Sequence, residues 1–216
     1  METDHTLVER RLLDGLLVPG AVALDAGCGR TTRLRFYRDR IARLVGVDAD
    51  EAAGRENPYL DEFVRADLDE GLPFPAAAFD LVYANFVLEH LSRPERAFAE
   101  WRRVLRAGGA LVLLTSNRAS PFLAAGDRLP ERVRLLLKRR GAGAEERDVY
   151  PTRYRTNTPE RLLRAAREAG FQPVAVVYVG TLHRYAARAP AAARLLRGLE
   201  GLLPERRRST IVAAFR

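Results

Sequence analysis

The stretch VALDAGCGRTT, residues 22–32, constrains the fold more than any other part of the sequence. An apolar run typical of a buried strand contains Asp25, and Gly27 and Gly29 follow it directly. Glycines at such a turn let a ligand approach the backbone closely. The pair begins the G-x-G-x-x-G pattern of dinucleotide sites, but Thr32 stands where the third glycine belongs. The loop predicts a ligand-binding α/β protein and leaves the ligand open.

Apolar runs and helical segments alternate along the first half of the chain. Strands are expected at residues 22–26, 43–49, 62–68, 79–85 and 108–117. The segment 33–42 between the first two is expected to be helical. Strands joined by helices imply crossover connections and a parallel sheet. Later in the chain, residues 158–169 predict a helix, and residues 171–180 and 209–216 predict two more strands.

The helix after the fourth strand carries the clearest boundary pattern. Ser92 with Glu95 three residues later has the spacing of a capping box, and Pro94 falls in the first turn. Apolar residues from Ala97 to Leu105 recur at the spacing of one buried helix face. Gly108, with the next glycine, is expected to end the helix.

Length and cysteine content limit the class of protein. The 216 residues suit a single domain, 1–216, whose cofactor-binding core spans 20–117. No apolar run approaches the roughly 20 residues of a membrane span, and the start of the chain has no apolar signal-peptide core. Cys28 is the only cysteine, so a reducing cytoplasm is the expected location.

Charge is distributed unevenly. Residues 1–100 carry 12 arginines against 19 acidic residues, whereas residues 101–216 carry 24 basic against 9 acidic ones. Two basic segments, 118–157 and 181–208, interrupt the alternation and are expected to be helical insertions after strands five and six, on the acceptor side or as a lid. The leucines of 195–203 fall on one helical face that either packs on the sheet or lies on anionic lipid. An anionic or phosphate-bearing partner is expected for this half.

Acids end three successive strands: Asp25, Asp48 and Asp67. An acid at the end of the second strand accepts hydrogen bonds from ribose hydroxyls in nucleotide-binding sheets. A carboxylate ahead of the glycines repels a pyrophosphate and suits a cationic amine, which argues against a dinucleotide. The third acid can accept from the amine of adenine. The three acids together predict an adenosine with an amino-acid tail, S-adenosylmethionine, and hence S-adenosylhomocysteine as product.

The segments ALDAGCGRT, VGVDAD, RADLDEGLPFPAAAFDLVYANFVLEHL and RAFAEWRRVLRAGGALVLLTSN resemble the class I S-adenosylmethionine-dependent methyltransferases of the type-11 branch, over residues 20–117. The resemblance implies a Rossmann-like, doubly wound sheet of seven strands, mostly parallel, with the last strand antiparallel. It also implies a set of cofactor-binding residues: Asp25, Gly27, Cys28, Gly29, Asp48, Ala49, Asp67, Leu68 and Asn85. No metal is expected.

The methyl acceptor and the catalytic residues stay open. His90 and Glu89, just after the fourth strand, are candidates for a base, which only a protonated acceptor needs. Tyr150, Arg153, Tyr154 and Arg155 form an aromatic and basic cluster that closes over an acceptor or stays in solvent. A small-molecule, glycan or lipid-linked acceptor, methylated on oxygen or nitrogen, is expected. The alternatives are an RNA methyltransferase and a non-catalytic S-adenosylmethionine-binding partner, and peripheral membrane contact is a further option.

Overall fold

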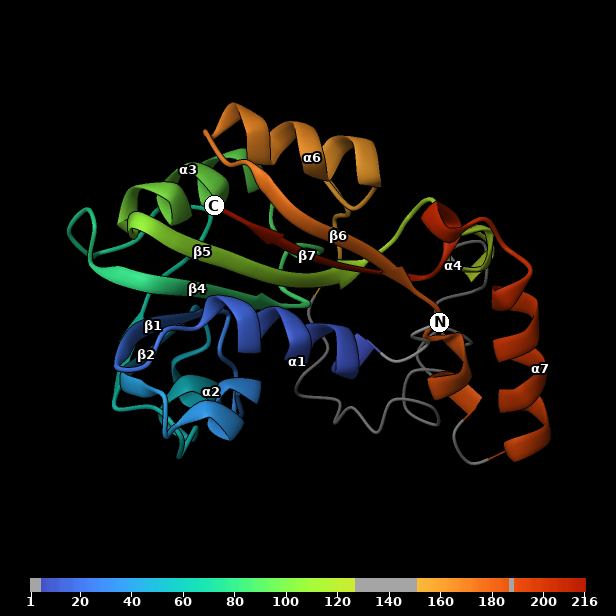
Figure 1. Ribbon diagram of the computed structural model, residues 1–216, viewed down its shortest axis with the longest axis horizontal. Coiled ribbons are helices and arrows are strands. Elements are labelled where there is room, and N and C mark those ends of the chain that lie inside the picture. The colour runs from blue at the N-terminus through green and yellow to red at the C-terminus, as the bar shows by residue number, and fades with distance from the viewer. Residues whose placement is uncertain (1–4, 127–150, 187–188) are drawn as a thin grey trace.

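The computed structural model describes residues 5–126, 151–186 and 189–216 (Figure 1). Residues 127–150 of the expected insertion 118–157, which include Tyr150, lie outside these residues. The described strands are β1 (Ala21–Ala26), β2 (Ile41–Asp48), β3 (Glu62–Arg65), β4 (Phe79–Asn85), β5 (Leu105–Ser116), β6 (Pro173–Val179) and β7 (Thr210–Phe215). The described helices are α1 (His5–Leu16), α2 (Glu51–Arg55), α3 (Pro94–Val104), α4 (Pro121–Gly126), α6 (Pro159–Glu168) and α7 (Pro190–Gly201), with short 3-10 turns η1 (Arg33–Tyr37), η3 (Leu182–Ala186) and η4 (Glu205–Arg207).

The strands form one seven-stranded sheet in the order β3-β2-β1-β4-β5-β7-β6. The first five strands run parallel, and β7 lies antiparallel between β5 and β6. The order reverses at β1 and β4, so a crevice opens at the carboxyl ends of these two strands. The expected doubly wound sheet with an antiparallel last strand is confirmed.

Both faces of the sheet are covered, which explains why its central strands are apolar on both sides. Alternate residues of β1, such as Leu24, face a core completed by Phe98 and Trp101 of α3 and Leu162 of α6. The intervening residues face a second core with α1 and η1. Figure 1 shows α3 and α6 on one face and α1 on the other. This double packing fixes the ends of β1, β2 and β4.

Several local expectations are wrong. Gly108 does not end the helix, because α3 ends at Val104 and Gly108 lies within β5. The segment 33–42 forms only the 3-10 turn η1 before β2 begins at Ile41. Ser92 does not cap α3, whose N-terminal residue is Pro94 and whose preceding residue, Arg93, makes no side-chain capping bond. The carboxylate of Asp69, from the loop after β3, instead accepts the backbone N–H groups of Ser92 and Arg93 at 2.7–3.0 Å. A long-range contact has replaced the local capping box.

The leucines of 195–203, for which the sequence left packing on the sheet and contact with lipid open, are divided in the structure. Leu195, Leu199 and Leu202 are 64%, 37% and 84% exposed, whereas Leu196 and Leu203 are partly buried. Glu200 is the buried residue of this helix. Among the helices that the structure describes, none combines the length and the hydropathy needed to cross a membrane.

Candidate active site

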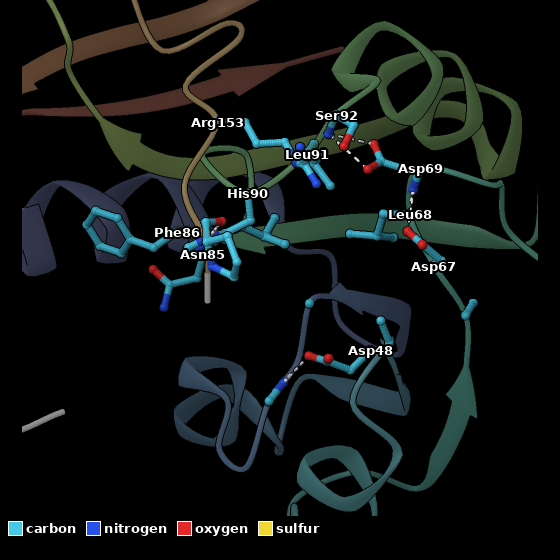
Figure 2. A pocket seen from close by; sticks show the side chains of 16 residues that line it. Asp48, Asp67, Leu68, Asp69, Asn85, Phe86, His90, Leu91, Ser92 and Arg153 are labelled. Atoms are coloured by element: carbon cyan, nitrogen blue, oxygen red, sulfur yellow. Dashed lines mark hydrogen bonds between the residues drawn. The ribbon is translucent and has the colours of Figure 1, made fainter. Parts of the chain in front are cut away.

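A cavity of about 510 Å³ opens at the carboxyl ends of β1, β2 and β4, and Figure 2 shows the side chains around it. It brings together seven of the nine residues expected to bind the cofactor and one of the two expected to be catalytic: Gly27, Gly29, Asp48, Ala49, Asp67, Leu68, Asn85 and His90. Segments far apart in the sequence therefore meet at the end of the sheet where the topology predicts a ligand.

The glycine loop directs its amides into the protein. The N–H groups of Gly27 and Cys28 both donate to the carbonyl of Val47, at 2.8 and 3.0 Å. The N–H of Gly29 donates to the Asp48 carboxylate at 2.9 Å. These three amides tie the loop to β2 and are engaged within the protein, so they do not form the anion cradle that a pyrophosphate requires. The loop geometry argues against a dinucleotide.

The two glycines serve different purposes. Gly27 has a φ of +81°, and a Cβ there would lie 2.5 Å from a methyl carbon of Val87. Gly29 has a φ of +49°, and a Cβ there would meet nothing within 4 Å, because the cavity lies beside it. Gly27 permits close packing against Val87. Gly29 has no side chain that would extend into the cavity.

Acidic groups line the cofactor end of the cavity. Asp48 accepts N–H bonds from Gly29 and Asp50, which fix its carboxylate at the rim. Asp67 is exposed, and its carboxylate accepts the N–H of Asp69 at 2.9 Å. Burial alone would raise the pKa of the Asp69 carboxyl, but hydrogen bonds from Arg93 and Ser92 outweigh it and lower that pKa. All three acids can offer oxygens to hydroxyl or amine donors.

Asn85 carries an unsatisfied acceptor. Its side-chain oxygen is buried and has no hydrogen-bond partner among the residues that the structure describes. A buried oxygen without a partner costs free energy, about 1–3 kcal/mol, unless a ligand donates to it. Because Asn85 lines the cavity, the missing donor points to an occupant with an N–H or O–H group at this position.

Three expected residues do not line the cavity. Asp25 lies beneath the glycine loop and is 2% exposed. Its burial, opposed by a Thr32 hydrogen bond and reinforced by the negative charges of Asp48 and Glu9, raises the pKa of Asp25 to about 7. Cys28 is buried as well, and this burial raises the pKa of its thiol, so it stays protonated.

Glu89 is the third. Its carboxylate is 4% exposed and accepts hydrogen bonds from the hydroxyl groups of Thr115 and Ser116, both at 2.8 Å. Its backbone carbonyl accepts the N–H groups of Arg153 and Tyr154 at 2.7 and 3.1 Å. Glu89 therefore joins the loop after β4 to the end of β5 and to the segment 151–157.

The other end of the cavity is formed by the loop after β4 and by this returning segment. His90 Nδ1 lies 2.8 Å from the carbonyl of Pro151, and since a carbonyl only accepts, Nδ1 carries the proton. Arg153 also lines the cavity. Among residues 5–126, 151–186 and 189–216, no carboxylate forms an ion pair with its guanidinium. In Figure 2, Arg153 lies far from Asp48, with His90 between them.

The sequence placed Arg153 in a cluster without locating it. Of that cluster, Tyr154 points its ring to Arg118, whose guanidinium carbon lies 4.4 Å from the ring centroid, and Arg155 does not line the cavity. The sequence missed Ala66, Asp69, Phe86, Val87, Leu91, Ser92 and Pro151 as lining residues. Most of these adjoin predicted positions, but Pro151 arrives from a distant segment that no local pattern marks.

The fold and the cavity define the class of protein: the architecture is that of the Rossmann-like, class I S-adenosylmethionine-dependent methyltransferases. A solved S-adenosylmethionine-dependent methyltransferase from Mesorhizobium loti superposes on 97% of this chain and 96% of its own, with a TM-score of 0.67 and 21% identity. Geranyl diphosphate C-methyltransferase from Streptomyces coelicolor, solved with S-adenosylhomocysteine, superposes on 97% of this chain and 78% of its own, with a TM-score of 0.62 and 17% identity.

The sequence comparisons agree with the fold. Residues 24–113 match the type-11 family model described as Methyltransferase domain, and this match, the sequence relatives and the fold together support a class I S-adenosylmethionine-dependent methyltransferase. A malonyl-[acyl-carrier protein] O-methyltransferase from Enterobacter lignolyticus is 33% identical over 135 residues, which are 59% of this chain and 50% of that protein. The chain thus spans about half the length of this relative.

Proposed function

We propose that this protein transfers a methyl group from S-adenosylmethionine to a carboxylate of its acceptor and so forms a methyl ester. The main support for a carboxylate acceptor is the Arg153 side chain. Its guanidinium has no carboxylate partner among the described residues, and Arg153 lines the same cavity as Asp48 and Asn85. A guanidinium binds a carboxylate through two parallel hydrogen bonds. The O-methyltransferase named above supports oxygen as the methylated atom.

The cofactor end of the cavity suits S-adenosylmethionine. Asp48 would accept from the ribose hydroxyls, while Asp67 and Leu68 would hold the adenine. The unsatisfied oxygen of Asn85 would accept from the amino-acid end, near the reacting methyl group. The charge of Asp25 beneath the loop would favour the cationic amine. The inward-facing amides of the loop are compatible with this ligand, because it brings no phosphate.

The residues at the acceptor end mainly have to position the acceptor. S-adenosylmethionine, when bound, supplies a methyl group whose bond to sulfur breaks as the bond to the acceptor oxygen forms, and the sulfur keeps the electron pair. A carboxylate oxygen is already ionised, so no proton is removed and no general base is required. Arg153 would hold one carboxylate so that an oxygen faces the methyl group, and His90 would keep the 151–157 segment in place through Pro151.

The test compares Arg153→Gln with Arg155→Gln, an exposed arginine two residues away that does not line the cavity. Malonyl groups on an acyl carrier protein, free dicarboxylates and their amides are offered with methyl-labelled S-adenosylmethionine. We expect methyl esters from the acids and none from the amides. Arg153→Gln should raise KM by about 10–100-fold, the loss of a charge-assisted pair, and Arg155→Gln should not. Label transfer to RNA or to uncharged acceptors, unaffected by Arg153→Gln, would overturn the proposal.

A further inference from the structure

Helix α7 is attached to the sheet through a charged residue. The Glu200 carboxylate is 2% exposed, and its two oxygens accept the N–H groups of Leu182 and Ser209 at 2.7 and 3.2 Å. Gly180 lies directly against this side chain, since a Cβ there would be 2.9 Å from a carboxylate oxygen. The carboxylate thus joins α7 to η3, which follows β6, and to the residue that precedes β7.

The apolar side of α7 faces outward. Leu195 and Leu199 of α7 and Leu202, its C-cap residue, follow one another at i, i+4 and i+7, so they form one stripe. Their exposed fractions of 64%, 37% and 84% show that the stripe is in contact with solvent. The leucines of a surface helix normally face the core of the protein. Here the position of Glu200 orients them away from it.

Positive charge lies beside this stripe. Arg194 and Arg197 are exposed on α7, and Arg206 and Arg207 are exposed in η4 just beyond it. No ion pair joins these four arginines to a carboxylate within the part of the chain that the structure describes. The nearest exposed acid along the chain, Glu205, pairs with Arg208. The surface formed by α7 and η4 is therefore apolar along one line, with positive charge on one side of that line and beyond the C-terminus of the helix.

We infer that α7 docks onto an anionic lipid bilayer. An exposed leucine stripe with arginines beside it is the pattern of helices that lie in the head-group region, with leucines toward the acyl chains and arginines near lipid phosphates. Figure 1 shows α7 beyond the carboxyl ends of β4 and β5, the end of the sheet at which the cavity opens. Docking brings that end of the molecule to the membrane surface. The inference rests on α7 alone and holds whatever the acceptor is.

The test uses the whole protein and two kinds of vesicle, phosphatidylcholine alone and phosphatidylcholine mixed with phosphatidylserine. We expect co-sedimentation with the mixed vesicles only, weakening as salt rises. The variant L195Q/L199Q/L202Q keeps helix-forming residues and removes the apolar stripe, and it should bind at least about tenfold more weakly. R194Q/R197Q should also bind more weakly at low salt. Phe36→Gln removes a 63% exposed apolar side chain from η1 and should bind like the wild type.

Several results would overturn this assignment. The first is a wild-type protein that sediments with neither kind of vesicle. The second is a triple variant that sediments with the mixed vesicles as strongly as the wild type. A lower thermal midpoint of the triple variant would show that the leucines are buried within the chain. A wild-type dimer that the triple variant loses, or binding to an acyl carrier protein in place of vesicles, would assign the stripe to a protein partner. S-adenosylhomocysteine binding, measured by calorimetry on the same variants, should not change, so a defect in the proposed activity can be distinguished from a defect in docking.

Discussion

Asp25 is a carboxylic acid enclosed by protein directly beneath the glycine loop. Because burial raises its pKa to about 7, the folded protein holds a proton at pH 5–6 that the unfolded chain, with a pKa of about 3.9, has already released. The folded state therefore loses stability relative to the unfolded chain as pH rises from about 4 to 7. The sequence keeps an acid here at a cost in stability, which is characteristic of a functional site.

Replacing Asp25 with a neutral residue should reveal how much its burial lowers the free energy of unfolding. We expect Asp25→Asn to raise the free energy of unfolding at pH 8 by about 2–4 kcal/mol, because the variant no longer buries a charge, and to change it little at pH 5. S-adenosylhomocysteine should bind at least tenfold more weakly at pH 8, since the carboxylate beneath the loop is lost. Urea unfolding at both pH values and calorimetry measure the two effects. A variant less stable than the wild type at both pH values would contradict this account.

The sequence predicted those site residues whose position depends on local structure. Gly29 and Asp48 follow strands whose apolar runs are plain, and parallel strands end at one edge, so their meeting could be expected. Arg153 could not be placed, because it reaches the cavity through backbone bonds to Glu89, 64 positions earlier in the chain. No pattern in either segment records that pairing. The acceptor end of the site is thus the part that sequence alone leaves undetermined.

At the scale of elements, α3 depends on a residue outside itself. Asp69→Ala should lower the free energy of unfolding by about 0.5–2 kcal/mol, the usual loss for an N-terminal cap, because the N–H groups of Ser92 and Arg93 lose their acceptor. Ser92→Ala is the matched comparison and should cost less, since it leaves both N–H bonds in place. Thermal unfolding of the two variants decides the order. If Ser92→Ala lowered the free energy of unfolding more than Asp69→Ala does, the capping box predicted from the sequence would be the better account.

The positions of elements buried on both faces could be predicted from the sequence. The packing of elements buried on one face was harder to predict. The central strands are apolar throughout, so their positions follow from composition. The leucine period of α7 identifies a helix with an apolar face, but it does not say whether that face meets the protein or something else. Segment 33–42 has helical periodicity, yet it forms one 3-10 turn, in which the Thr32 hydroxyl accepts the N–H of Leu34.

For the whole molecule, occupation of the cavity should appear as thermal stabilisation. At a concentration of 100 times its dissociation constant, S-adenosylhomocysteine should add about 2.7 kcal/mol to the folded state. For a chain of this length that corresponds to a rise of about 5–10 °C in Tm. NAD at the same concentration should leave Tm unchanged, because the amides of Gly27, Cys28 and Gly29 are engaged within the protein and do not face its pyrophosphate. A scanning fluorimetry series with both ligands provides the measurement, and an equal rise with NAD would refute the assignment of the cavity.

The inward-facing loop amides also bear on redesign of this domain for nicotinamide chemistry. Substituting glycine for Thr32 would complete the three-glycine motif on paper. It would also remove a hydroxyl that bonds Asp25 and caps η1, while the amides of Gly27, Cys28 and Gly29 would stay engaged with Val47 and Asp48. Thr32→Gly alone would therefore complete the dinucleotide motif without making the site bind a dinucleotide. The connection between β1 and β2 would have to be rebuilt first, so that its amides point outward.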